Sequence, residues 1–186
     1  MVLSKRACCW IGVAGWAVAG LLAGAVAGRA EGVGSLESVG VRGGIPGNDS
    51  SRQFNQAEAF GNLNLPWGWD LGKSWHLRSR LDLSAGWLGD KGNNTAIGTV
   101  GPSLVVNRGQ FPVSLEGGIS PTILSDNDFA SKNFGTDVQF TSHLGLNWGF
   151  ARHWCLSYRY QHMSNAGLAS RNPGLNLHVF GLSYKF

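Results

Sequence analysis

The stretch SWHLRSRLDLSAGWL, residues 74–88, alternates apolar and polar side chains over most of its length. One set of alternate positions is apolar except for Ser79. The other set carries His76, Arg78, Arg80 and Asp82. A period of two is that of a β-strand, whose successive side chains point to opposite faces. Charges this dense on one face need water or partners, so the stretch predicts a strand between an apolar and a polar environment.

Seven further segments fit the same description and bring the predicted strands to eight. Alternation is strong in 138–150, 153–164 and 176–186, and weaker in 33–45, 54–65, 95–106 and 111–120. The connections at 66–73, 107–110 and 149–152 are tight, whereas those at 46–53, 88–94, 121–136 and 165–175 are mostly longer and more polar. Short turns at one end and longer loops at the other are typical of outer-membrane barrels. The sequence therefore predicts an all-β fold, an eight-stranded antiparallel, up-and-down transmembrane β-barrel.

Aromatic residues support this prediction. The tryptophans near the expected periplasmic ends would form a membrane-interface girdle; they are Trp67, Trp69, Trp75, Trp148 and Trp154. The terminal Phe186 resembles the assembly signal of outer-membrane barrels. The alternative is a soluble, lipocalin-like barrel that encloses its apolar face. An eight-stranded interior only just accommodates side chains, so it cannot hold Trp, Tyr and Phe from every strand.

The N-terminal segment differs from the rest of the chain. Lys5 and Arg6 precede an apolar run over 7–27, which small residues close. This order predicts a signal peptide over residues 1–30, cleaved after Ala27 or Ala30, and leaves 31–186 as the barrel. The alternative is a membrane helix, although the many Gly and Ala residues make a weak span.

Cleavage would change the charge and cysteine content of the mature chain. Three of the fifteen basic residues leave with the signal, which gives 12 − 11 = +1, and only Cys155 remains of three cysteines. The basic character therefore belongs largely to the signal, and nucleic acid is not an expected partner. A single cysteine allows no intrachain disulfide, and without Cys clusters or His residues at ligand spacing no metal site is indicated. No cofactor is expected.

Two polar residues interrupt the apolar face of segment 153–164 at its extracellular end. The outward register places His162 and Ser164 on one face, about 6.6–7 Å apart along the strand. Asn176 begins the next strand on the same outer face. A histidine beside a hydroxyl is the arrangement in which a base activates a nucleophile. The alternative interpretation is an ordinary polar rim where the strand meets its loop.

The residues around this pair carry a family resemblance. YRYQHMSNAGL at 158–168, followed by NPGLN at 172–176, resembles the active-site signature of the lipid A 3-O-deacylase family. The resemblance implies a carboxylic ester hydrolase in the outer membrane of a Gram-negative bacterium. Its substrate would be lipid A, the lipid anchor of lipopolysaccharide, from which it would remove the ester-linked 3-hydroxyacyl chain.

The resemblance also implies roles for individual residues. Ser164 would be the nucleophile, and His162 the general base and then the general acid. Asn172 and the backbone N–H of Gly167 would form the oxyanion hole, and Asn165 would brace the loop.

One position departs from the family pattern. Where the family places a glutamate to orient the histidine, this chain has Asn176. An asparagine can accept a hydrogen bond from the imidazole and fix its tautomer, but it cannot stabilise the imidazolium by charge. Asp126 and Asp128 lie on an extracellular loop, and nothing in the sequence places them near His162.

Other polar residues have structural interpretations. His143 and the charged residues of the polar faces are expected to pair inside the lumen; they are His76, Arg78, Arg80, Asp82, Glu116 and Arg159. His178 faces lipid near the site.

Two other functions stay open at this point, a non-catalytic barrel for adhesion or envelope stability, and an esterase acting on an acyloxyacyl or phospholipid ester. The expected partners are lipid A and membrane lipids, and a homodimer is compatible with the sequence.

Overall fold

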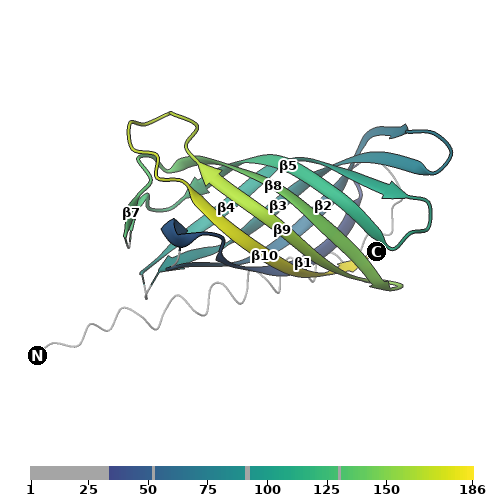
Figure 1. Cartoon of the computed structure of the whole chain (residues 1–186), viewed down its shortest axis with the longest axis horizontal. Helices are drawn as coiled ribbons and strands as arrows, with labels where there is room; N and C mark the ends of the chain where they lie inside the picture. The colour runs from purple at the N-terminus through teal and green to yellow at the C-terminus, as the bar shows by residue number, and fades with distance from the viewer. Residues whose placement is uncertain (1–33, 52, 91–92, 130) are drawn as a thin grey trace, which may run out of the picture.

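The computed structural model describes residues 34–51, 53–90, 93–129 and 131–186. The predicted signal peptide over 1–30 lies outside the described residues. Eight long strands close into one antiparallel barrel in the order β1-β10-β9-β8-β5-β4-β3-β2, which confirms the predicted fold (Figure 1). They are β1 (Leu36–Pro46), β2 (Phe54–Asp70), β3 (Trp75–Asp90), β4 (Asn93–Arg108), β5 (Val113–Leu124), β8 (Val138–Ala151), β9 (Trp154–Ser164) and β10 (Leu175–Lys185). In the described part of the chain, no helix has the length and apolarity to cross a membrane.

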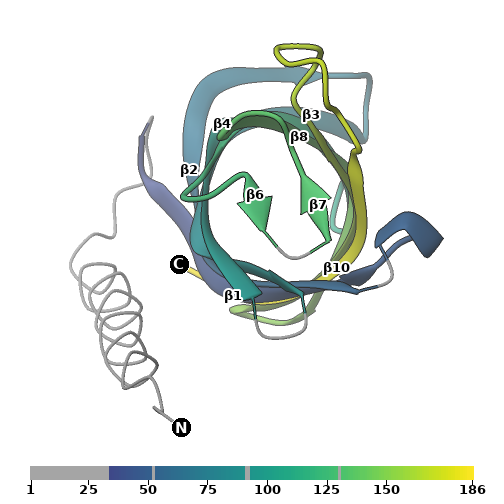
Figure 2. The same cartoon turned by 90° about the vertical axis from the view of Figure 1, so that its left-hand side faces the viewer.

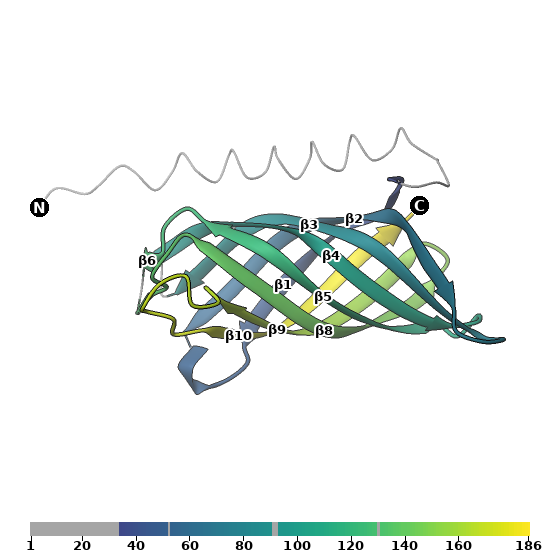
Figure 3. The same cartoon turned by 90° about the horizontal axis from the view of Figure 1, so that it is seen from above.

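The two ends of the barrel differ. The C-terminus and the short turns lie at one end, and the loops over 125–137 and 165–174 lie at the other (Figure 1). The strands run obliquely across the wall, as closure of a sheet requires (Figure 3). The five predicted girdle tryptophans are each between 43% and 58% exposed. The wall therefore presents aromatic and aliphatic side chains outward, to the medium that a bilayer supplies.

The β2–β3 hairpin extends further than expected. The sequence predicts a turn over 66–73, but β2 continues to Asp70 and resumes pairing with β3 at Gly68. Proline has no N–H for the ladder, so Pro66 is taken up in a bulge between Asn64 and Gly68. Ser79, the polar interruption of the apolar face, donates a 2.6 Å hydrogen bond from its hydroxyl to the carbonyl of Trp67 in this bulge.

The middle of the lumen holds a buried ionic network. Glu116 binds both Arg80 and Arg159, and Arg80 also lies 2.9 Å from Asp82. His143 Nε2 lies 3.8 Å from one carboxylate oxygen of Asp82 and 3.8 Å from one of Glu116. Each charge is thus taken out of water together with a partner, as predicted.

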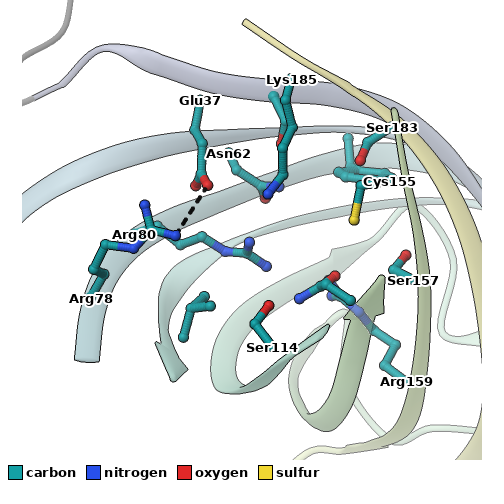
Figure 4. A pocket seen from close by; sticks show the side chains of 14 residues that line it. Glu37, Asn62, Arg78, Arg80, Ser114, Cys155, Ser157, Arg159, Ser183 and Lys185 are labelled. Atoms are coloured by element: carbon teal, nitrogen blue, oxygen red, sulfur yellow. Dashed lines mark hydrogen bonds and ion pairs between the residues drawn. The ribbon is translucent and has the colours of Figure 1, made fainter. Parts of the chain in front are cut away.

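Two of the expected members lie elsewhere. His76 and Arg78 are near the periplasmic end of β3, where they reach water; they pair with Asp70 at 2.6 Å and with Glu37 at 4.0 Å. The pair of Arg78 and Glu37 borders a small polar cavity that also contacts Arg80 and Arg159 (Figure 4).

An apolar cluster lies in the lumen at the extracellular end, which the sequence did not predict. The loop expected over 121–136 forms a short hairpin, β6 (Asp128–Phe129) and β7 (Lys132–Asn133), which lies within the mouth of the barrel (Figure 2). Its Phe129 and Phe134 are buried against Phe54 at ring-centroid distances of 5.8 and 6.1 Å. We call residues 126–137 the plug hairpin, because these rings fill the lumen directly behind β9 and β10.

Candidate active site

The register of β9 and β10 brings two site residues together. His162 and Asn176 are direct partners in the antiparallel ladder, and His162 Nδ1 lies 2.8 Å from Asn176 Oδ1. A carbonyl oxygen only accepts hydrogen bonds, so Nδ1 must carry the proton. In the neutral imidazole Nε2 then carries the free lone pair, which is the tautomer that a general base requires.

Ser164 is the last residue of β9. It lies on the same outward face as His162, two positions along the strand, and is partly exposed. Its hydroxyl makes no hydrogen bond with any other residue that the structure describes. Nothing in the described part of the chain therefore competes with His162 for this hydroxyl. Catalytic contacts of this kind often tighten only when substrate binds.

A structured loop follows Ser164, and Asn165 is its centre. This side chain is fully buried; its Nδ2 donates to the carbonyls of Phe134 (3.0 Å) and Arg171 (2.6 Å). Its Oδ1 accepts from the N–H of Gly167 at 2.9 Å. Ala166 and Gly167 adopt left-handed conformations, with φ of 53° and 85°, which turn the chain sharply after Asn165. We call residues 165–174 the catalytic loop.

The two oxyanion candidates differ in availability. Asn172 is exposed, and its Oδ1 accepts from the backbone N–H of Asn165 at 3.1 Å. That bond fixes the amide and leaves its Nδ2 donors for another group. The N–H of Gly167 is already bonded to Asn165, so it can reach a substrate oxygen only by sharing its proton or by changing partner.

Two contacts around the site were not predicted from the sequence. The hydroxyl of Ser51, at the end of the helical turn η2 (Asp49–Ser51), accepts the backbone N–H of Asn176 at 3.0 Å. The ammonium of Lys132 donates to the carbonyl of Gly174 at 2.7 Å. Ser51 and Lys132 both lie far along the chain from the segments 158–168 and 172–176. The one sequence signal for an inward plug hairpin is the pair of phenylalanines, Phe129 and Phe134, in a mostly polar loop.

The remaining candidates stand apart from the pair. His178 Nδ1 lies 2.9 Å from the hydroxyl of Tyr158, one step down the wall. Asp126 and Asp128 bond within the plug hairpin, and neither contacts His162. Among the described residues, no three His, Cys, Asp or Glu side chains group as metal ligands would.

Fold and site together define a class, an outer-membrane barrel whose polar cluster opens on the lipid-facing wall at its extracellular end. A sequence model of the family described as lipid A 3-O-deacylase (PagL) matches residues 56–185. That match covers well over half of the chain, so the protein belongs to the lipid A 3-O-deacylase (PagL) family.

Individual relatives agree with this assignment. The lipid A deacylase PagL of Bordetella bronchiseptica is 38% identical over 72 residues, which span 39% of this chain and 40% of that protein. The lipid A deacylase PagL of Pseudomonas aeruginosa is 29% identical over 133 residues, or 66% of this chain and 75% of that protein. The crystal structure of the outer membrane enzyme PagL superposes with a TM-score of 0.70 at 18% identity, covering 80% of this chain and 99% of that one. The superposition shows the common fold.

Proposed function

We propose that this protein is a lipid A 3-O-deacylase, a carboxylic ester hydrolase that removes the ester-linked 3-hydroxyacyl chain of lipid A. The observation that carries the proposal is the pair of His162 and Asn176 on the outer wall, two residues from Ser164. Family membership supplies the reaction class. A site on this face is reached most readily by a lipid that lies in the same leaflet, and lipid A is such a lipid.

The proposed reaction begins at Ser164. His162 Nε2 takes the hydroxyl proton while Ser164 Oγ attacks the ester carbonyl carbon, which gives a tetrahedral oxyanion. Collapse of this intermediate breaks the bond to the sugar oxygen at the 3-position, and His162 returns the proton to that oxygen. Water then attacks the acyl carbon while His162 takes its proton. Collapse of this second intermediate breaks the bond to Ser164 Oγ, His162 returns the proton to that oxygen, and a 3-hydroxy fatty acid is released.

Asn176 has a narrower role than a carboxylate in its place. Its carbonyl oxygen holds the Nδ1 proton of His162, so the ring presents Nε2 to the serine. The amide of Asn176 is neutral, so it stabilises the positive charge that develops on the imidazole only through its dipole. We therefore assign Asn176 to orientation, and expect this enzyme to gain less from charge stabilisation than a triad with an acid.

Stabilisation of the oxyanion is assigned first to Asn172. Its Oδ1 is engaged, so its NH₂ group is the part that can point at the substrate. The N–H of Gly167 serves as the second donor by sharing its proton with Asn165 Oδ1, and Asn165 braces the loop that holds both. Removing one such donor typically lowers kcat by about 10²–10³-fold. The set needs no metal or cofactor, because nucleophile, base and oxyanion donors all come from this chain.

Acyl chains have an apolar surface to lie on. Below the site, the wall exposes Tyr160, Phe180 and Leu182, and Leu168 projects from the catalytic loop. The reacting ester would thus sit at the level of His162, with its chains against the wall. A homodimer in the membrane is a further proposal, which sedimentation of the purified barrel in detergent tests.

Mass spectrometry of lipid A from host cells with and without this chain tests the function. Loss of one 3-hydroxyacyl mass, with the fatty acid recovered free, is the expected result. An unchanged lipid A profile contradicts the proposal and favours a non-catalytic barrel. Loss of a secondary acyl group, or of a phospholipid chain, would keep the hydrolase and change its bond.

A further inference from the structure

A lysine without a carboxylate partner lies behind the catalytic loop. Lys132 makes no ion pair with any described residue; its ammonium donates to Gly174 O at 2.7 Å and lies 5.5 Å from the ring centroid of Phe54. Burial lowers the pKa of this lysine below its ordinary value. This cation is partly desolvated and is held by one carbonyl and one aromatic face, so its position is defined by these two contacts.

Gly174 connects this lysine to the catalytic histidine. The residue adopts a left-handed φ of 63°, and a Cβ atom there would lie 3.3 Å from His162 Cε1. Gly174 therefore lies beside the imidazole ring, and a side chain there would crowd the ring. The conformation of this peptide thus bears on the space left for His162.

The plug hairpin supports the catalytic loop at a second point. The carbonyl of Phe134 accepts from Asn165 Nδ2 at 3.0 Å, at the start of the loop. Gly135 lies so close to the loop that a Cβ atom there would be 2.4 Å from the carbonyl of Arg171. Since Phe134 is buried in the lumen, the hairpin is anchored to the barrel, and it contacts both ends of the loop.

We propose that Lys132 is a positioning residue for the deacylation, because its ammonium fixes Gly174 and, through Gly174, the imidazole of His162. The inference rests on the proposed function. It assigns to the plug hairpin a role beyond closing the lumen, which is to support the active site from inside the wall. Lys132 does not touch substrate in this scheme.

The test compares purified full-length variants in detergent, with lipopolysaccharide as substrate. Lys132→Met keeps an unbranched apolar stem over Phe54 and removes the ammonium; we expect kcat to fall roughly tenfold to a hundredfold. KM should stay within about twofold, because no contact with substrate is lost. Lys132→Arg still donates to the carbonyl and should keep about half of the rate. Lys73→Met removes the same charge from the β2–β3 turn at the opposite end and should match wild type.

A second measurement does not depend on catalysis. Hydrogen–deuterium exchange of the peptides covering 165–174 should be faster in Lys132→Met than in wild type or Lys73→Met. Heat-dependent migration in SDS shows which variants form the closed barrel. If Lys132→Met does not assemble, Lys132→Gln replaces it. Its side chain carries a shorter donor, so its kcat should lie between wild type and the loss expected for Lys132→Met.

The outcomes separate the two proposals. Wild-type kcat and wild-type exchange in assembled Lys132→Met would overturn the inference and leave the proposed function standing. A raised KM at unchanged kcat would also overturn it, since it would place Lys132 at the substrate. Faster exchange in a protein whose wild type releases no hydroxy acid would support the link between Lys132 and the loop and reject the deacylase.

Discussion

His162 and Asn176 are direct cross-strand partners, and their side chains are joined by a 2.8 Å hydrogen bond. Opposite residues of an antiparallel pair have Cβ atoms about 4.5–5.5 Å apart, a distance fixed by the ladder itself. Two strands of a closed barrel therefore set the geometry of this bond, and no loop motion is needed to form it. The loop side of the site, from Ser164 to Gly174, depends on separate contacts.

The first prediction concerns Asn176. Asn176→Ala should lower kcat, because the Nδ1 proton of His162 loses its acceptor and the tautomer is no longer fixed. Loss of the correct tautomer costs about 10⁴-fold in a serine protease triad, which sets the upper end of the expected effect. Asn176→Glu should keep or raise kcat, since a carboxylate orients the ring and also stabilises its positive charge.

Steady-state kinetics on purified barrel checks both variants. Both changes lie on the outer face, so the closed barrel should still form, and heat-dependent migration in SDS verifies this. Unchanged kcat in Asn176→Ala would mean that another residue orients His162, and this role would have to be reassigned.

The second prediction concerns the reacting groups themselves. Ser164→Ala and His162→Asn should each abolish release of 3-hydroxy fatty acid, while the closed barrel still forms, because neither side chain packs in the lumen. Lipid A mass spectrometry of cells that carry each variant provides the measurement. Substantial residual activity in Ser164→Ala would remove that residue from the nucleophile role.

The strand faces could be predicted from the sequence because alternation has only two phases. Once Trp154 and Leu156 are assigned to the lipid side, His162 must share their face, and the structure has this arrangement. The proximity of Asn176 also followed, since a β-hairpin returns its second strand beside its first. Both inferences use local pattern and one neighbouring strand.

Contacts between distant loops could not be predicted in this way. Ser51 lies 125 residues from Asn176, and Lys132 lies 42 residues from Gly174, with no periodic pattern relating either pair. Their contacts depend on how loops fold over the rim, which side-chain alternation does not specify. The inward plug hairpin has the same origin, because its two phenylalanines could equally have faced the membrane.

The third prediction separates the two functions of Asn165. Asn165→Asp keeps an acceptor for the N–H of Gly167 but removes the donors to Phe134 and Arg171, whose carbonyls would then face a carboxylate. Each buried polar group left unpaired costs about 1–3 kcal/mol. We expect Asn165→Asp to be at least as inactive as Asn165→Ala, with faster hydrogen exchange over 165–174. Full activity in the Asp variant would show that only the acceptor matters.

The fourth prediction concerns Gly174. Gly174→Ala places a methyl group in tight contact with the imidazole, 3.3 Å from His162 Cε1, and puts a side chain at a φ of 63°. The ring must shift or the loop must open, so kcat should fall about tenfold or more. Gly72→Ala, at a φ of 91° in the β2–β3 turn with open space around it, carries the same backbone cost far from the site. Equal rates for the two variants would deny any packing role to Gly174.

The last prediction tests the support of Asn176 from the β1–β2 loop. Ser51 is fully buried, and its hydroxyl accepts the backbone N–H of Asn176 at 3.0 Å, while the N–H of Gly47 donates to the carbonyl of Asn176 at 2.8 Å. The loop therefore continues the pairing of β10 beyond the end of β1. Ser51→Ala leaves one backbone N–H without its acceptor and loosens the strand end that presents the amide to His162.

We expect Ser51→Ala to lower kcat about fivefold to thirtyfold, an effect of roughly 1–2 kcal/mol for one lost acceptor. Ser125→Ala is the matched control, because the Ser125 hydroxyl accepts the backbone N–H of Ala96 at 2.9 Å at the same rim, on other strands. Both variants remove a serine that receives a backbone N–H, but only Ser51 adjoins the histidine pair. The measurement is kcat on lipopolysaccharide together with thermal unfolding of the barrel. Equal losses of kcat in the two variants would show a general effect on the rim, and Asn176 would then need no support from Ser51.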